Sequence, residues 1–263
     1  MKFSKIHKKL STNIILNTLL IYIVPSTTYI VCNLDDEQLS LDAIALQTGT
    51  DKSTAFHAYT LVYDKLFSEL RHKPIKFLEI GIQNGFSVHM WDKYFDNLHA
   101  SLHFIDIDPN AVTFCKQKQQ SHLISHRAKF YIADQENKEN LKQFITIADE
   151  KFDIIIDDGG HTMIQQQNSF EILFPYLKKG GIYIIEDLHT SYWQQRSNIE
   201  YGGGDQNSTI NFLLNLVHDI NTVGAQSECA DFKKFDRTQF KNYYQEHIES
   251  IIFHSSLCFI TKR

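Results

Sequence analysis

Two kinds of hydrophobic pattern alternate along most of this chain of 263 residues. Short runs of β-branched and aromatic residues, each ended by polar residues, are typical of strands buried on both faces of a parallel sheet. Between them lie stretches of helical length with apolar residues three and four positions apart. The alternation predicts an α/β fold with a mainly parallel, doubly wound sheet. Strands are expected at 75–80, 101–108, 128–134, 152–156 and 182–185.

The segments outside these strands predict helices and a closing hairpin. Residues 35–70 form a helical extension, in which an apolar stripe runs from Phe56 to Leu70. The polar turn Thr50-Asp51-Lys52 reads as an N-cap with a solvated lysine. The terminal stretch ESIIFHSSLCFITK reads as two strands around a turn, so the C-terminal strand is expected to be antiparallel. Helices are expected at 86–95, 165–179, with its stop at Gly180-Gly181, and 209–221.

The first 34 residues differ from the rest of the chain. MKFSKIHKK is basic, and no charged residue occurs from Leu10 to Leu34. This layout is typical of a secretory signal, and the uncharged window is also long enough for a membrane anchor. A partly buried N-terminal helix is the third interpretation. We therefore predict a signal-like or membrane-associated segment at 1–34 and one domain at 35–263, with the extension at 35–70 and a Rossmann-like core at 75–263.

Composition excludes some classes of partner and compartment. The formal net charge is −5, and no basic run occurs beyond the N-terminus. Because sequence-independent nucleic-acid binding depends on clustered lysine and arginine, DNA and RNA are not expected as partners. The cysteines are scattered without a CxxC pair, which favours reduced thiols over a disulfide framework. They are Cys32, Cys115, Cys229 and Cys258.

Two of the predicted strands end in paired acids with a histidine close behind. One half reads FDIIIDDGGH, and the other reads GGIYIIEDLHTSYW. In a β-α-β unit both strands end at the same edge of the sheet, where open α/β sheets bind ligands. We therefore expect four carboxylates and two imidazoles in one crevice, with a divalent cation to offset their charge. They belong to Asp157, Asp158, His161, Glu186, Asp187 and His189.

The first predicted strand runs into a glycine-punctuated turn, Glu79-x-Gly81-x-x-x-Gly85. Glycine in such a turn lets the backbone approach a bound nucleoside, and the following helix points free N–H groups at it. Asp106 ends the second strand, where an acid can accept hydrogen bonds from ribose hydroxyls. Asp108 fits better as the cap of the next helix. The Asp134-Gln135 pair ends the third strand, as an adenine-reading pair or as a plain turn.

These features resemble class I S-adenosylmethionine (SAM) dependent methyltransferases, and in particular the macrocin/mycinamicin sugar O-methyltransferase family. The segments that carry the resemblance are GTDK, LEIGI, SVHMW, DDGGH, IEDLHTSYW and IIFHSSLCFITKR. The resemblance implies a Rossmann-like class I fold, SAM and Mg²⁺ as cofactors, and methylation of a hydroxyl of a sugar or glycosylated small molecule in natural-product biosynthesis. It also implies homo-oligomers in the cytosol.

The family's site residues fall on matching positions of this chain. His161 falls on the catalytic base, and the metal ligands fall on Asp158, Glu186 and Asp187. The SAM contacts fall on Ser87, Asp106, Asp134 and Gln135, beside the Glu79, Gly81 and Gly85 turn. The family has serine where Gly160 stands, which predicts a looser loop around His161. The hydrophobic N-terminus is also foreign to the family.

The chemistry of the residues agrees with this assignment. A sugar hydroxyl has a very high pKa, and Mg²⁺ on carboxylates can chelate vicinal hydroxyls and stabilise the developing alkoxide. His161 can then take the proton as general base, and His189 is the competing base. Two alternatives stay open. One is a non-haem iron oxygenase that uses Asp158, His161 and His189. The other is a non-catalytic SAM or nucleotide binder, tethered to a membrane through residues 10–34.

Because SAM is made in the cytosol, we expect the catalytic domain to be cytoplasmic. The acceptor is expected to contact loops at 194–207 and 225–244, whose sequences do not reveal its identity.

Overall fold

The structure is a computed structural model, and the chain divides into two compact units, Met1–Ser40 and Leu41–Arg263. In the first unit, the strands β1 (Ile15–Leu16), β2 (Leu19–Ile21) and β3 (Val31–Cys32) pair in that order. Most of the signal-like segment, and with it the predicted membrane association, lies outside the described residues. The structure describes residues 15–16, 19–21, 31–32, 38–196, 198–225 and 242–263. No helix in these ranges is long and apolar enough to cross a bilayer.

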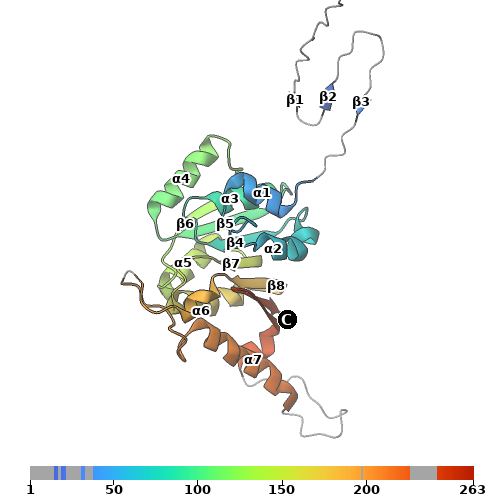
Figure 1. Cartoon of the computed structure of the whole chain (residues 1–263). Helices are drawn as coiled ribbons and strands as arrows, with labels where there is room; N and C mark the ends of the chain where they lie inside the picture. Colours follow the sequence, from blue (N-terminus) through green and yellow to red (C-terminus); the bar gives the residue numbers. More distant parts are fainter. Residues whose placement is uncertain (1–14, 17–18, 22–30, 33–37, 197, 226–241) are drawn as a thin grey trace, which may run out of the picture. The chain divides into compact units, whose positions relative to one another are not determined.

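The second unit is built on a seven-stranded sheet with the order β6-β5-β4-β7-β8-β10-β9 (Figure 1). The first five strands in this order are parallel, whereas β10 runs antiparallel to both β8 and β9. The predicted mainly parallel sheet with an antiparallel C-terminal strand is therefore confirmed. The strands are β4 (Lys76–Ile80), β5 (Ser101–Asp106), β6 (Ala128–Ile132), β7 (Phe152–Asp157), β8 (Leu177–Ile185), β9 (Ile248–His254) and β10 (Leu257–Lys262).

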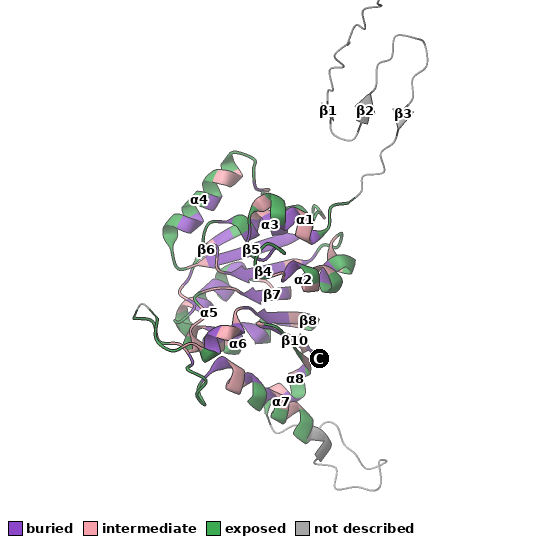
Figure 2. Cartoon of the chain, in the orientation of Figure 1, coloured by how far each residue is buried: buried purple, intermediate pink, exposed green. Residues whose placement is uncertain are grey.

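Helices cover both faces of this sheet and bury one hydrophobic cluster on each. Helices α1 to α4 contribute to one cluster, and α5 to α7 contribute to the other. Figure 2 shows the strands buried between helices whose outer surfaces are exposed. This arrangement is the doubly wound layering that the alternating pattern predicted. The helices are α1 (Leu41–Thr48), α2 (Thr60–Phe67), α3 (Phe86–Tyr94), α4 (Pro109–Gln120), α5 (Lys138–Ala148), α6 (Met163–Leu173), α7 (Thr209–Ala225) and α8 (Tyr243–His247).

Two helix predictions are wrong at their ends. Helix α6 ends at Leu173 and not at Lys179, because Pro175 enters a short 3₁₀ turn (η2, Phe174–Tyr176). Gly180 and Gly181 therefore lie inside β8. The stripe from Phe56 does not begin a helix either. Helix α2 starts at Thr60, and the Phe56 side chain is 75% exposed.

The sheet order places the ends of β4 and β7 side by side, although these strands are far apart in the chain. The chain leaves β4 toward β5 and β6 on one side, and later continues from β7 to β8 on the other side. This reversal of winding is the point at which open α/β sheets form a ligand crevice beyond the carboxyl ends of their strands. The acids that end β7 and β8 lie at this edge.

Candidate functional site

A cavity of about 600 Å³ opens at this edge of the sheet. Its walls come from the turns after β4, β5, β6 and β7 and from the segment between α1 and α2. Most of the predicted site residues share this cavity. They are Gly81, Ser87, Asp106, Asp134, Gln135, Asp158, His161 and Asp187, whereas Glu79, Gly85 and Glu186 do not line it.

The glycine turn after β4 is shaped mainly by the protein itself. Gly81 has φ +98°, and a Cβ at this position would lie 2.1 Å from the backbone oxygen of Asp158. Glycine is therefore required because the β4 turn packs against the β7 turn. Asp106 holds the same turn, since its Oδ2 accepts hydrogen bonds from Ile82 N (2.7 Å) and Gln83 N (3.0 Å). Asp108 caps α4 by accepting from Asn110 N, as predicted.

Glu79 lies behind the cavity wall. Its carboxylate accepts hydrogen bonds from Ser87 Oγ (2.9 Å) and Trp91 Nε1 (3.0 Å), and it is fully buried. Burial raises the pKa of Glu79 to about 7, although Lys52 opposes this shift. Glu79 therefore orients Ser87 at the start of α3, and Ser87 is the member of this pair that lines the cavity.

The Asp134-Gln135 pair separates into two roles. Asp134 Oδ1 accepts from Glu136 N at 2.9 Å, as in a polar turn. The amide of Gln135 is occupied on both sides, because Nε2 donates to Asp157 Oδ1 (2.6 Å) and Oε1 accepts from Gly160 N (2.9 Å). Gln135 thus anchors the loop after β7.

The expectation that four carboxylates meet in one crevice is wrong for Asp157. Successive side chains of a strand point to opposite faces of the sheet. Asp157 is fully buried against Gln135. Asp158, one residue further along, instead reaches Lys52, which also contacts Glu186. Of the other three acids, Asp158 and Asp187 line the cavity, and Glu186 lies buried behind it against Lys52.

Lys52 was predicted to be solvated, and this prediction is wrong. Its side chain is 1% exposed, and Nζ lies 2.8 Å from both oxygens of Glu186 and in contact with Asp158 Oδ2. Nζ also lies 3.6 Å from Glu79 Oε1. Burial alone would lower the pKa of Lys52, but Asp158, Glu186 and Glu79 outweigh it and raise this pKa well above its usual value. A buried ammonium thus supplies part of the positive charge that the acids require.

Glu186 uses both of its carboxylate oxygens within this buried network. Besides Lys52, it accepts a hydrogen bond from Tyr63 OH at 2.7 Å, and it is 1% exposed. Lys52 lies in the GTDK segment and Tyr63 in the apolar stripe of α2, and no other feature of the sequence points to them. Direct ligation of a metal by Glu186 stays a prediction.

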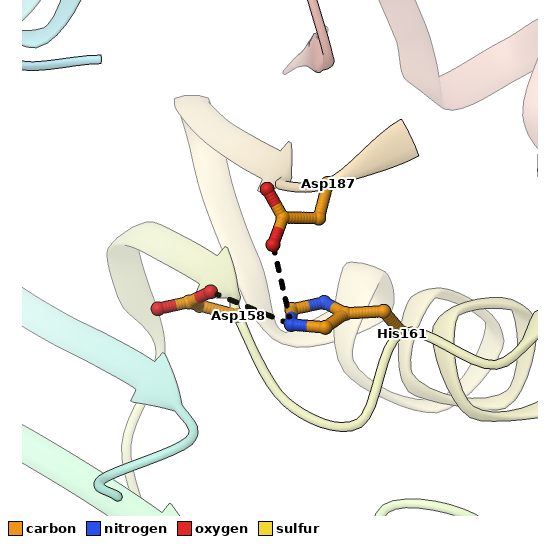
Figure 3. Close-up of side chains that lie close together, drawn as sticks. All are labelled: Asp158, His161 and Asp187. Carbon is orange, nitrogen blue, oxygen red and sulfur yellow. Dashed lines mark ion pairs between the residues drawn. The ribbon is translucent and has the colours of Figure 1, made fainter. Parts of the chain in front are cut away.

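Asp158, His161 and Asp187 form the open part of the site (Figure 3). His161 Nε2 lies 3.4 Å from Asp187 Oδ2 and 3.9 Å from Asp158 Oδ1. Their side chains are about one fifth exposed, so solvent and ligands reach them. Burial alone would raise the pKa of Asp187, but His161, the Tyr59 hydrogen bond and nearby imidazoles lower it. Asp187 is therefore ionised at neutral pH.

Two of these residues adopt left-handed backbone conformations. His161 has φ +59° and Asp187 has φ +55°. Such conformations cost free energy in residues other than glycine, and they concentrate at functional sites. Here surrounding contacts hold them: Thr190 Oγ1 donates to His161 O at 3.0 Å, and Gln166 Nε2 donates to Glu186 O at 2.9 Å.

The open cluster fits a hard divalent cation. One ligand atom each from Asp158, His161 and Asp187 lies within 4.8 Å of the others. Carboxylate oxygens suit Mg²⁺, which binds through one or two carboxylates and keeps further positions for other oxygen ligands. His161 Nδ1 is buried and has no hydrogen-bond partner among the described residues.

His189 lies outside this cluster. Its Nδ1 pairs with Ser256 Oγ at 2.9 Å and lies 4.0 Å from Asp187 Oδ1, and its ring packs on Trp193. Among the described residues, the groups close enough to share an ion do not include His189. The geometry therefore does not favour the two-histidine iron site.

Gly160 stands in the loop between Asp158 and His161. Its N–H donates a hydrogen bond to Gln135 Oε1, and this bond fixes the loop although a glycine stands at position 160. A Cβ at Gly160 would lie 2.2 Å from Gln165 Oε1. Gln165 in turn completes a capping box with Thr162 at the start of α6. Glycine at 160 and glutamine at 165 are thus complementary, and the expectation of a loose loop finds no support in these contacts.

The fold and the edge site define a class of protein. A family model described as a methyltransferase domain matches residues 78–188, and the sheet with its antiparallel last strand is that of Rossmann-like class I methyltransferases. Residues 78–188 therefore match a methyltransferase domain, and the sheet has the fold of class I methyltransferases.

Particular relatives are sugar O-methyltransferases. The 8-demethyl-8-alpha-L-rhamnosyl tetracenomycin-C 2'-O-methyltransferase of Streptomyces olivaceus is 29% identical over 85% of this chain and 54% of its own length. The L-olivosyl-oleandolide 3-O-methyltransferase of Streptomyces antibioticus is 34% identical over 60% of this chain and 39% of its own length. The chain thus spans about half the length, or less, of these relatives.

A solved methyltransferase is also similar to this chain in sequence and fold. The MycE methyltransferase from the mycinamycin biosynthetic pathway, in complex with Mg and SAH, is 25% identical and has a TM-score of 0.68. The match covers 86% of this chain and 55% of that chain. A further structure of MycE also holds mycinamycin VI, with a TM-score of 0.67 at 24% identity.

Proposed function

We propose that this chain is a SAM-dependent O-methyltransferase that methylates a hydroxyl of a sugar or glycosylated small molecule. The observation that carries the proposal is the position of His161, whose Nε2 faces Asp158 and Asp187 in the cavity that Asp106 and Ser87 also line. A base and two acids therefore lie in the same cavity as the predicted nucleoside contacts. The named activities of the relatives and the contents of the MycE crystals support this reading.

The reaction follows from these positions. The acceptor oxygen attacks the methyl carbon of SAM, the carbon–sulfur bond breaks, and SAH leaves with the electron pair. The hydroxyl proton passes to His161 Nε2, and the resulting imidazolium is stabilised by Asp158 and Asp187. Mg²⁺ held by these two carboxylates would orient the acceptor oxygens and stabilise the developing negative charge. Asp106 would accept hydrogen bonds from the ribose of SAM.

The test combines binding and turnover. Calorimetric titration of the whole chain with SAM is expected to show binding with and without Mg²⁺. Mass-shift screening of glycosylated acceptors is expected to show methylation that EDTA abolishes. Asp158→Ala should lower this turnover by at least about a thousandfold while SAM affinity changes by less than about threefold, because Asp158 is a predicted metal ligand and not a predicted SAM contact.

Each unexpected result would contradict a different part of the proposal. Turnover that is indifferent to EDTA would overturn the metal assignment but not the methyltransferase. SAM binding without transfer to any acceptor would favour the non-catalytic binder, and Fe²⁺-dependent oxidation with 2-oxoglutarate would favour the oxygenase. The cytoplasmic location and the homo-oligomer remain predictions.

A further inference from the structure

Each carboxylate of the open cluster uses its two oxygens differently. Asp158 directs Oδ2 to Lys52 Nζ and Oδ1 toward His161 Nε2. Asp187 accepts a hydrogen bond from Tyr59 OH on Oδ1, at 2.7 Å, and directs Oδ2 toward His161 Nε2. One oxygen of each acid is therefore anchored by a buried side chain, and the other faces the open site.

Both anchors come from the short segment between α1 and α2. Lys52 is 1% exposed and Tyr59 is 4% exposed, so neither contact competes with bulk water. The segment is itself fixed, because Thr60 N donates to Lys52 O at 3.1 Å. Asp42 of α1 also accepts hydrogen bonds from Thr54 Oγ1 (2.7 Å) and Thr60 Oγ1 (2.6 Å). The two anchors thus project from a rigid element.

We propose that Lys52 and Tyr59 are positioning residues, which set the rotamers of Asp158 and Asp187 so that Oδ1 of the first and Oδ2 of the second converge on a divalent cation and His161. This inference rests on the proposed function and deepens it. Groups that hydrogen-bond to ligating carboxylates fix their orientation, and their loss typically weakens metal affinity or activity about 10–100-fold. The helical extension therefore takes part in building the site.

The main experiment compares two tyrosines with equivalent hydrogen bonds. Tyr59→Phe removes the 2.7 Å bond to Asp187, and the control Tyr94→Phe removes a 2.7 Å bond from Tyr94 OH to Asp64, away from the cavity. Mn²⁺ serves as the probe, with its free concentration read by electron paramagnetic resonance in a titration of the full chain. We expect Tyr59→Phe to raise the dissociation constant of Mn²⁺ at least about tenfold, and Tyr94→Phe to change it less than about twofold.

Lys52→Gln is the second arm, with the exposed Lys65→Gln on α2 as its control. The amide at position 52 can still donate to one carboxylate, but it cannot hold both Asp158 and Glu186. We expect Mn²⁺ binding to weaken at least about tenfold in Lys52→Gln and to stay unchanged in Lys65→Gln. Thermal unfolding of each variant shows whether the fold persists, and the Tyr59 arm stands alone if Lys52→Gln does not fold.

The outcomes separate the inference from the proposed function. If Asp158→Asn weakens Mn²⁺ binding but Tyr59→Phe binds like the wild type, the positioning role is overturned and the metal site survives. If the wild type binds no Mn²⁺, the metal assignment fails, and the inference fails with it. Equal weakening in Tyr59→Phe and Tyr94→Phe would show a general effect on the fold and would also overturn the inference.

Discussion

The ends of β7 and β8 have the same pattern of paired acids, but the buried acid of each pair has a different kind of partner. Two acids stand at the end of each strand, and the first is buried whereas the second is partly exposed in the site. They are Asp157 and Asp158 at the end of β7, and Glu186 and Asp187 directly after β8. The buried acids differ in their partners. Asp157 faces the neutral amide of Gln135, whereas Glu186 faces the ammonium of Lys52.

The partners determine how the cost of burying each carboxylate is offset. Burial raises the pKa of Asp157 to about 7, since its hydrogen bonds only partly offset the desolvation. Asp157 can relieve its burial by taking up a proton. Burial and the neighbouring Asp158 also raise the pKa of Glu186, but the Lys52 ammonium and the Tyr63 hydroxyl oppose this shift. The Glu186 network therefore contains a cation, next to the acids that face the ligand. The buried acid at the end of β7 is therefore offset only by neutral hydrogen-bond donors, whereas the buried acid after β8 is offset by a cation.

The largest expected effect comes from removing that cation. Lys52→Met leaves Glu79, Asp158 and Glu186 without a positive partner, and we expect a loss of about 3–5 kcal/mol in the free energy of unfolding at pH 7.5. The matched change on the β7 side is Gln135→Met. It removes only the hydrogen bonds of a neutral amide, and we expect it to lower the free energy of unfolding by about 1–3 kcal/mol. Urea denaturation of both variants measures the difference. Equal losses would mean that the two ends do not differ in charge dependence.

The next effect is a pH dependence at Asp157. Its folded pKa of about 7 lies above the unfolded value, so its contribution to stability is fully present below about pH 4 and is lost as pH rises through 7. Asp157→Asn keeps an oxygen that can accept from Gln135 and cannot ionise. From pH 5 to pH 8, the free energy of unfolding of this variant should rise by about 2–4 kcal/mol relative to that of the wild type. Denaturation at both pH values tests it, and a pH-independent difference would contradict the burial argument.

The smallest effect concerns the loop that joins Asp158 to His161. Gly160→Ser forces Gln165 away and breaks the capping box, which should cost about 1 kcal/mol. In a Gln165→Ala background the same serine should cost almost nothing, because the atom that it meets is gone. Thermal unfolding of the single and double variants measures this coupling. Additive losses would show that Gln165 is not the obstacle.

Much of the fold could be predicted from the sequence, because hydrophobic period and turn residues are local signals. The strands predicted at 75–80, 101–108 and 152–156 are present as β4, β5 and β7, with ends that differ by no more than two residues, and Asp108 caps its helix. The prediction of a helix to Lys179 is wrong because Pro175, and not the two glycines, ends the helical segment, and the glycines lie inside β8. Local patterns do not reveal which of two nearby breakers acts first.

The sequence by itself determined that paired acids and a histidine would gather at one edge of a parallel sheet, since strand direction fixes where strands end. Only the tertiary structure decided which acid of each pair faces the site. That choice depends on the alternation of side chains across the sheet and on which partners lie on each face. Lys52 and Tyr59 come from more than a hundred residues earlier in the chain, and no local pattern links them to Asp158 and Asp187. Their contacts exist only because the segment between α1 and α2 lies at the carboxyl ends of the strands, where burial makes a charged partner necessary.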